Sequence, residues 1–195
     1  MKRVGITGGM GCGKTTVVAE FERLHIPAFV ADKVAGSYYN DPSFLDEVRS
    51  VLGNSIFNPD GTIDKKRVAE KVFSDRQALL SLNALVHPRV MDDFDTFCRQ
   101  HASSPYVLFE SAILYDYGLD LFMDKVICVY LSLDERLNRL RQRDHATDAS
   151  LLARIRSQLP AELVMQRADF VILNYEGNPR KRQVAFVDQQ LRNNC

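Results

Sequence analysis

The chain has 195 residues, which is the size of one domain with a small insertion, and 46% of them are apolar. Its 25 basic residues balance 25 acidic residues, so the net charge is zero, which disfavours bulk electrostatic binding to nucleic acid or anionic lipid. No apolar run approaches the roughly 18 residues of a membrane span. We therefore expect neither a nucleic-acid partner nor a membrane partner.

Short β-like runs alternate with helical patterns along the chain. The helical patterns cover residues 14–24 and 132–143, the second opening on a Ser132-x-x-Glu135 capping box, and Pro179 opens a last helix. Strands that alternate with helices indicate parallel βαβ units. We predict an α/β fold, with a parallel five-stranded sheet flanked by helices. The strand pattern falls at residues 3–7, 28–31, 106–109, 125–131 and 170–173.

Two stretches carry helical patterns without strands. Residues 37–101 are mostly helical, with turns at residues 58–61 and at His87-Pro88, and are too long for a simple crossover. We interpret them as a helical insertion. Residues 144–168 are helical and charged, which suits a mobile lid. The core of this single domain would then comprise residues 1–36, 102–143 and 169–195.

The cysteines and histidines show no spacing typical of a disulfide framework or a zinc site. The cysteines are far apart and form no CxxC pair. The first residues become glycine-rich at once and contain no signal-peptide core. These features predict a reduced, cytoplasmic protein. The four cysteines are Cys12, Cys98, Cys128 and Cys195, and the four histidines are His25, His87, His101 and His145.

The strongest motif lies at residues 8–15, which match the pattern G-x-x-x-x-G-K-[ST] between a predicted strand and a predicted helix. Glycines let the backbone curl so that its N–H groups face an anion, and the helix that follows adds the positive end of its dipole. Lys14 would bring a charge to the phosphates of a nucleotide, and the Thr15 hydroxyl would bind Mg²⁺. An ordinary glycine-rich turn is the alternative. The predicted phosphate-binding residues are Gly8, Gly9, Gly11, Cys12, Gly13, Lys14, Thr15 and Thr16.

Polar residues follow each of the four other predicted strands, with Ser132 and Asp134 after the fourth. Asp32, Glu110 and Asn174 would therefore meet at the sheet edge where ligands bind in open parallel sheets. Asp32 is our candidate for the general base at an acceptor hydroxyl, and a helix N-cap is the alternative. Glu110 would hold Mg²⁺ through water or bind the substrate, unless it serves as a cap or a salt-bridge partner.

Three arginines, Arg136, Arg139 and Arg143, share one face of a predicted helix. Positioned arginines stabilise the charge that develops in phosphoryl transfer. Arg139 and Arg143 are the better candidates because they lead into the predicted lid, and a solvated basic face is the alternative. His87 is either a substrate contact or a packed structural histidine.

The surroundings of the motif narrow the class of protein. The chain lacks a plausibly placed N-K-x-D motif or D-x-x-G switch of a GTPase, and its third strand does not end in the Asp-Glu of helicases and transporter ATPases. A chain of this length with an insertion and a lid fits a small-molecule kinase, whose lid closes over ATP to exclude water.

Several ordered blocks resemble the dephospho-CoA kinase family, within the P-loop nucleotide kinase superfamily. The resemblance runs from residue 5 to about residue 177, nearly the whole chain. Its opening block is shared with other nucleotide kinases, but the ordered set is more specific. The similar blocks are residues 5–16, Ala31-Asp32-Lys33-Val34-Ala35, His87-Pro88, the Arg139-Leu140-x-x-Arg143-Asp144 run, Arg154-Ile155-x-x-Gln158 and residues 168–174.

The resemblance implies transfer of the ATP γ-phosphate to the ribose 3′-hydroxyl of dephospho-CoA, which gives coenzyme A and ADP with Mg²⁺ as cofactor. It implies Asp32 as the base, Lys14 and the loop on the phosphates, and Asn174 near the adenine. Arg139 and Arg143 would assist transfer, and His87 and Glu110 would contact the acceptor in or beside the insertion. ATP and dephospho-CoA would be the partners, without an obligate protein partner.

The chain departs from the family pattern at three places. Val30 stands where the family often has Asp, the segment from Glu110 to Asp116 differs in length from the usual pattern, and His145 replaces a small residue at the lid hinge. None of these changes touches Lys14, Thr15 or Asp32. The alternatives that remain are a kinase of another nucleoside or nucleotide and a nucleotide-binding regulatory module.

Overall fold

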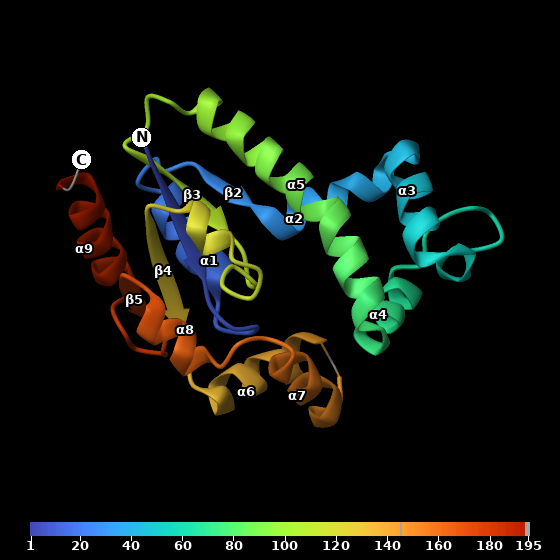
Figure 1. Ribbon diagram of the computed structural model, residues 1–195. Helices are drawn as coiled ribbons and strands as arrows, with labels where there is room; N and C mark the ends of the chain where they lie inside the picture. The colour runs from blue at the N-terminus through green and yellow to red at the C-terminus, as the bar shows by residue number, and fades with distance from the viewer. Residues whose placement is uncertain (145, 194–195) are drawn as a thin grey trace. The chain divides into compact units, whose positions relative to one another are not determined.

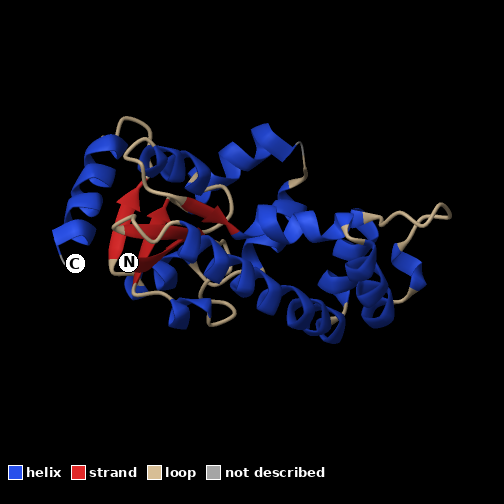
Figure 2. Ribbon diagram, turned by 90° about the horizontal axis from the view of Figure 1, so that it is seen from above, coloured by secondary structure: helices blue, strands red, loops and turns tan. Residues whose placement is uncertain are grey.

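The computed structural model describes residues 1–144 and 146–193. Five parallel strands form one sheet in the order β2-β3-β1-β4-β5, drawn in red in Figure 2. The prediction of an all-parallel five-stranded sheet is confirmed, and each predicted strand end lies within one residue of the observed end. The strands are β1 (Lys2–Thr7), β2 (Ala28–Val30), β3 (Tyr106–Glu110), β4 (Lys125–Tyr130) and β5 (Phe170–Leu173).

The register of the sheet brings the carboxyl ends of its central strands together. Ile6 of β1 and Val30 of β2 both pair with Glu110 of β3, and Thr7 pairs with Cys128 of β4. After β1 the chain runs to β2 at one edge of the sheet, and after β4 it runs to β5 at the other edge. The direction of the connections therefore reverses between β1 and β4. Such a reversal is where open α/β sheets bind ligands.

The chain divides into two compact units, Met1–Val30 with the part from Cys98 onward, and Ala31–Phe97. In the first unit, α1 (Lys14–Glu22) and α9 (Arg180–Asn193) bury apolar residues against the strands (Figure 1). Their shared cluster includes Val17, Phe21, Val184 and Leu191, with Ile6, Tyr106 and Ile127 from the sheet. This burial anchors the start of α1 at the sheet edge, because apolar packing supplies most of the stability of a short helix.

The helices α6 (Leu133–Asp144), α7 (Asp148–Arg156) and α8 (Ala161–Arg167) lie between β4 and β5 in the chain. The capping box is partly confirmed: the Ser132 hydroxyl donates to Glu135 at 2.8 Å, and the Glu135 N–H approaches Ser132 Oγ at 3.5 Å. Leu137, Leu140 and Leu151 join α6 to α7 in a small apolar cluster. The predicted lid is therefore helical; its hinge residue His145 lies outside the described residues.

The second unit is helical and has its own core. Phe44, Val48, Leu52, Val68 and Leu82 pack together within it. The predicted insertion spans residues 37–101. The observed unit starts six residues earlier, at Ala31, and its last residue, Phe97, comes four residues before the predicted end. Its elements are α2 (Ala31–Ser37), η1 (Tyr38–Asn40), α3 (Pro42–Leu52), η2 (Asn54–Ile56), α4 (Lys65–Ser74) and α5 (Arg76–Gln100), of which α5 extends into the first unit.

One predicted turn is wrong. The helix α5 continues through Pro88, although proline cannot donate the backbone hydrogen bond expected there. Buried residues on both sides, Leu82 and Val90, hold the two halves by packing. The turn at residues 58–61 is present, with the Gly61 N–H donating to the Asn58 carbonyl at 3.0 Å.

In the part of the chain that the structure describes, Cys12, Cys98 and Cys128 are buried, whereas Cys195 lies outside it. No described helix is both long enough and apolar enough to cross a bilayer.

Candidate active site

The phosphate-loop motif forms the connection between β1 and α1. Gly11 and Gly13 have φ values of 83° and 88°, in the left-handed region that glycine adopts without strain. Gly13 is also pressed against the Asn174 amide, where a Cβ atom would not fit. The loop thus needs glycine at residue 13 for two reasons, and α1 begins at the next residue.

Lys14 folds back onto its own loop. Its Nζ donates to the Gly8 carbonyl at 2.9 Å and lies 3.9 Å from Glu110 Oε1. Glu110 is the last residue of β3 rather than the residue after it, and its side chain is only 7% exposed. The structure therefore brings Lys14 and Glu110 together as predicted, and the salt-bridge alternative for Glu110 describes this contact.

Thr15 and Thr16 lie in the first turn of α1, directly after Lys14, and both are exposed. The Thr16 N–H donates to the Gly13 carbonyl at 3.1 Å, which starts the helix. The exposed Thr15 hydroxyl and the Glu110 carboxylate are oxygen donors of the kind Mg²⁺ prefers. In residues 1–144 and 146–193, no three His, Cys, Asp or Glu residues form a metal-binding group. One hydroxyl and one carboxylate, from Thr15 and Glu110, fit an ion held mainly by phosphates and water with one or two protein oxygens.

Asn174 fastens the last strand to the phosphate loop. It follows β5 directly and is 2% exposed. Its Nδ2 donates to the Cys12 carbonyl at 2.7 Å, and its Oδ1 accepts from Arg180 Nη1 at 3.1 Å. The Arg139 Nη2 donates to the Asn174 carbonyl at 2.8 Å. The sheet edge thus collects Arg139, Asn174 and the loop, three features that lie far apart in the sequence.

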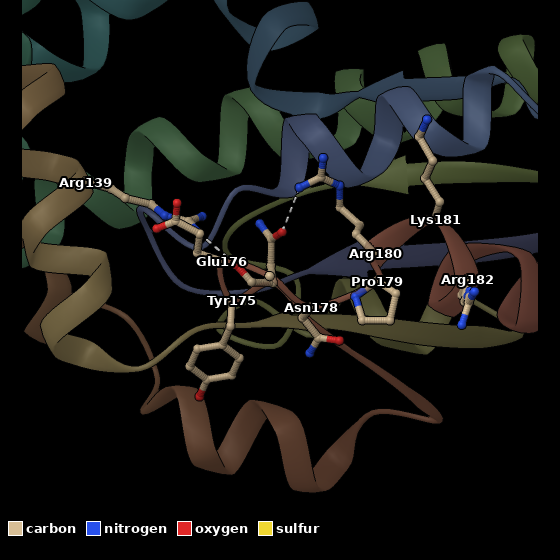
Figure 3. Close-up of a pocket in the computed structure, with 10 residues that line it drawn as sticks. Arg139, Tyr175, Glu176, Asn178, Pro179, Arg180, Lys181 and Arg182 are labelled. Atoms are coloured by element: carbon tan, nitrogen blue, oxygen red, sulfur yellow. Dashed lines mark hydrogen bonds between the residues drawn. The ribbon is translucent and has the colours of Figure 1, made fainter.

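A cavity of about 620 Å³ opens beside Asn174. Figure 3 shows Arg139 and Arg180 among the residues that line it, and Arg180 donates to the Asn174 side chain. Its volume and polar lining suit a nucleoside-sized ligand next to the phosphate loop. The lining residues are Arg139, Asn174, Tyr175, Glu176, Gly177, Asn178, Pro179, Arg180, Lys181 and Arg182.

Replacing Asn174 with alanine should lower the free energy of unfolding by about 1–3 kcal/mol, because the Cys12 carbonyl would lose its buried donor. Urea denaturation at neutral pH measures the change. Asn138→Ala is the control, since Asn138 is exposed on α6 and its side-chain oxygen accepts from Arg141 on the same helix. Equal urea midpoints for the two variants would show that the Asn174 clamp does not stabilise the fold.

Arg143 does not join the loop contacts. Its Nε donates to Asp144 Oδ1 at 2.6 Å, its side chain is 61% exposed, and Arg154 binds the same carboxylate at 2.9 Å. The hydrogen bond from Arg143, aided by Arg154, lowers the pKa of Asp144 to about 2. The bond from Arg154 to Asp144 thus connects α7 to α6, and Arg143 adds a second arginine from α6 to the same carboxylate.

This ion cluster predicts a pH dependence of stability. The pKa of Asp144 is lowered on folding from about 3.9, so its ionised form stabilises the fold above about pH 4. That contribution declines as the pH falls toward 2. The difference in urea midpoint between the parent and Asp144→Asn should therefore shrink from pH 5 to pH 2.5. A difference that does not change with pH would contradict this assignment.

Two contacts on the phosphate loop were not predicted. Arg136, ranked below the other two arginines from the sequence, is 4% exposed, and its Nε donates to the Met10 carbonyl at 2.8 Å. Gln158, beyond the end of α7, accepts from the Met10 N–H at 3.0 Å. Two signals in the sequence pointed to this side of the site: the spacing of Arg136 with Arg139, and the Arg154-Ile155-x-x-Gln158 block of the family resemblance.

Asp32 and His87 belong to the second unit. Asp32 is exposed in the first turn of α2, which begins at Ala31, so its N-cap alternative is wrong. His87 is half-buried in α5, and burial lowers its pKa. Asp32 follows the end of β2 by two residues, and the roles of both residues remain predictions.

The comparisons with known proteins agree over nearly the whole chain. The family model described as dephospho-CoA kinase matches residues 2–179. The chain belongs to the dephospho-CoA kinase family. The dephospho-CoA kinase of Fusobacterium nucleatum is 32% identical over 171 residues, covering 88% of each chain.

Solved structures show the same fold. The protein TT1252 of Thermus thermophilus superposes with a TM-score of 0.87 at 26% identity, covering 97% of this chain and 96% of that one. The dephospho-CoA kinase of Campylobacter jejuni gives a TM-score of 0.68 at 23% identity, with 98% of each chain covered. The chain is therefore an ATP-dependent P-loop kinase with dephospho-CoA kinase activity, the last step of coenzyme A biosynthesis.

Proposed function

We propose that the chain transfers the γ-phosphate of ATP to the ribose 3′-hydroxyl of dephospho-CoA. The observation that supports this most strongly is the phosphate loop with Lys14 folded into it and with Glu110, Asn174 and Arg139 around it. Phosphoryl transfer needs mainly positioning and electrostatic stabilisation. A loop of N–H groups at a helix N-terminus, with a lysine and an arginine, supplies both.

The phosphates of ATP would bind the N–H groups of the loop and the first turn of α1. Lys14 would then exchange its bond to the Gly8 carbonyl for one to a phosphate oxygen, since a charged acceptor binds an ammonium more strongly. Asn174, itself held by Arg139, would hold the loop from the side of the cavity, where the adenosine would lie. Arg139 would contribute positive charge near the transferred group.

Mg²⁺ would be held by the Thr15 hydroxyl directly and by Glu110 through water, and it would neutralise charge on the β- and γ-phosphates. The remaining roles in transfer belong to side chains of the protein. Glu110, 3.9 Å from Lys14, would keep the ammonium oriented toward the loop. Asp32 would accept the proton from the acceptor hydroxyl or orient that hydroxyl for attack.

The second unit would bind the acceptor, with His87 among its contacts. The helices α7 and α8 would form the lid that excludes water from the transferred phosphate. The existing bond between Gln158 and Met10 already links the end of α7 to the loop. Arg143 would act only after leaving Asp144, so its part in transfer would depend on lid movement.

A panel of acceptors tests the proposal. Purified protein is incubated with Mg-ATP and dephospho-CoA, AMP, thymidine, adenosine or buffer alone, and ADP formation and phosphorylated products are measured. The proposal predicts rapid transfer to dephospho-CoA alone. Phosphorylation of AMP or thymidine but not of dephospho-CoA would support a kinase of another nucleotide. ATP binding without transfer to any acceptor would support a regulatory module.

A further inference from the structure

Arg136 is a buried cation beside the phosphate loop. It lies in the first turns of α6 and is 4% exposed. Its Nε donates to the Met10 carbonyl at 2.8 Å, and its guanidinium lies against Gly9, where a Cβ atom would be 2.7 Å from Nη1 and still closer to Cζ. Glycine at residue 9 thus makes room for a planar cation on the outer side of the loop.

The other polar group of Met10 is also held. The Met10 N–H donates to Gln158 Oε1 at 3.0 Å. Gln158 and Arg136 thus bind the backbone N–H and the backbone carbonyl of the same loop residue. Met10 also packs on the apolar cluster of α6 and α7. A loop that is already fixed at Met10 loses less conformational freedom when it binds an anion.

Among the residues that the structure describes, none neutralises the charge of Arg136 at close range. No carboxylate in residues 1–144 and 146–193 forms an ion pair with it, in contrast to Lys14, which lies 3.9 Å from Glu110. Glu162 acts on it only at longer range, and burial lowers the pKa of Arg136. A buried cation without a counter-ion is costly, and an anion bound in the adjacent loop would reduce that cost.

We propose that Arg136 is a positioning residue for the phosphoryl donor: it fixes the phosphate loop through the Met10 carbonyl and provides a buried positive charge that favours the anion-bound loop. The inference rests on the proposed use of this loop for ATP. It adds to the lysine and arginine already assigned there a third cation, which acts from the outer side of the loop.

Three substitutions separate the two parts of this role. In both arginine and glutamine the fourth side-chain atom from Cα is a nitrogen that can donate, so Arg136→Gln keeps a donor for the Met10 carbonyl and removes the charge. Arg136→Met removes both, and Arg136→Lys keeps the charge. Arg141→Gln is the control, because Arg141 is exposed on the same helix and pairs with Asp148.

Calorimetry of inorganic tripolyphosphate binding measures the affinity of the loop for phosphates, because this ligand carries no adenosine and no acceptor is present. Arg136→Met should weaken this binding and raise the KM for ATP by about tenfold, with a lower kcat and an unchanged KM for dephospho-CoA. Arg136→Gln should weaken tripolyphosphate binding by about threefold while kcat stays near the parental value. Arg141→Gln should match the parent.

Parental affinity for tripolyphosphate in Arg136→Met would overturn the proposal, and so would an equal rise in the KM of both substrates. If Arg136→Met does not fold, Arg136→Lys must bind tripolyphosphate more tightly than Arg136→Gln; equal or weaker binding would overturn the electrostatic role. Because this assay contains no acceptor, it gives an answer even if dephospho-CoA is not the substrate.

Discussion

Replacing Lys14 with alanine is expected to lower kcat/KM for ATP by at least about a hundredfold, with a higher KM and a lower kcat. The Lys14 ammonium lies within the loop itself: it donates to the Gly8 carbonyl and is 3.9 Å from Glu110. Its removal takes away a contact to the phosphates in the ground state and a stabilising charge in the transition state. Steady-state kinetics with varied ATP at saturating dephospho-CoA measures both effects.

Lys125→Ala is the matched control for this variant. Lys125 opens β4 at the opposite, amino end of the sheet, and it pairs with Asp169 at 2.7 Å. We expect its activity to stay within about twofold of the parent, since an exposed ion pair contributes little. Similar kinetics for Lys14→Ala and the parent would contradict the assignment of the loop.

Replacing Asp32 with asparagine should lower kcat by about 10²–10⁴-fold and leave the affinity for ATP unchanged. The side chain is exposed in the first turn of α2, two residues after β2 ends, and asparagine keeps its size while removing the basic oxygen. A role in proton transfer affects the chemical step rather than nucleotide binding. Single-turnover rates, together with calorimetry of ATP binding, separate the two.

Asp46→Asn provides the comparison for Asp32. Asp46 is an exposed aspartate of α3 in the same unit, and it pairs with Arg49 three residues later. It should retain parental kcat. A kcat for Asp32→Asn within about threefold of the parent would exclude Asp32 as the base, and a parallel loss of ATP affinity would move its role to nucleotide binding.

The strands and the phosphate loop could be predicted because their signals are local. Each strand is a short apolar run, and the loop is one continuous motif whose glycines, lysine and threonine have separate physical tasks. Asp32 and Asn174 could be placed at strand ends by the same local reasoning. The continuation of α5 through Pro88 could not be predicted in this way. Packing of Leu82 and Val90 on either side outweighs the local preference of proline for a helix break.

The ranking of the arginines shows what local patterns leave out. Periodicity placed Arg136, Arg139 and Arg143 on one helix face, but it could not say which carboxylates or carbonyls each would meet. Arg143 binds its neighbour Asp144, whereas Arg136 reaches a carbonyl 126 residues away in the chain. The Asn174 clamp on Cys12 spans 162 residues. Such contacts depend on the assembled sheet edge, and single-sequence patterns do not contain them.

The position of the transferred phosphate tests the central claim most directly. The protein is incubated with Mg-ATP labelled in the γ-phosphate and with dephospho-CoA, and the purified product is treated with a 3′-nucleotidase. Our account predicts one labelled phosphate per product molecule, a product that co-migrates with coenzyme A, and complete release of the label by the nucleotidase. A label that resists this enzyme, or ATP turnover without any labelled product, would contradict it.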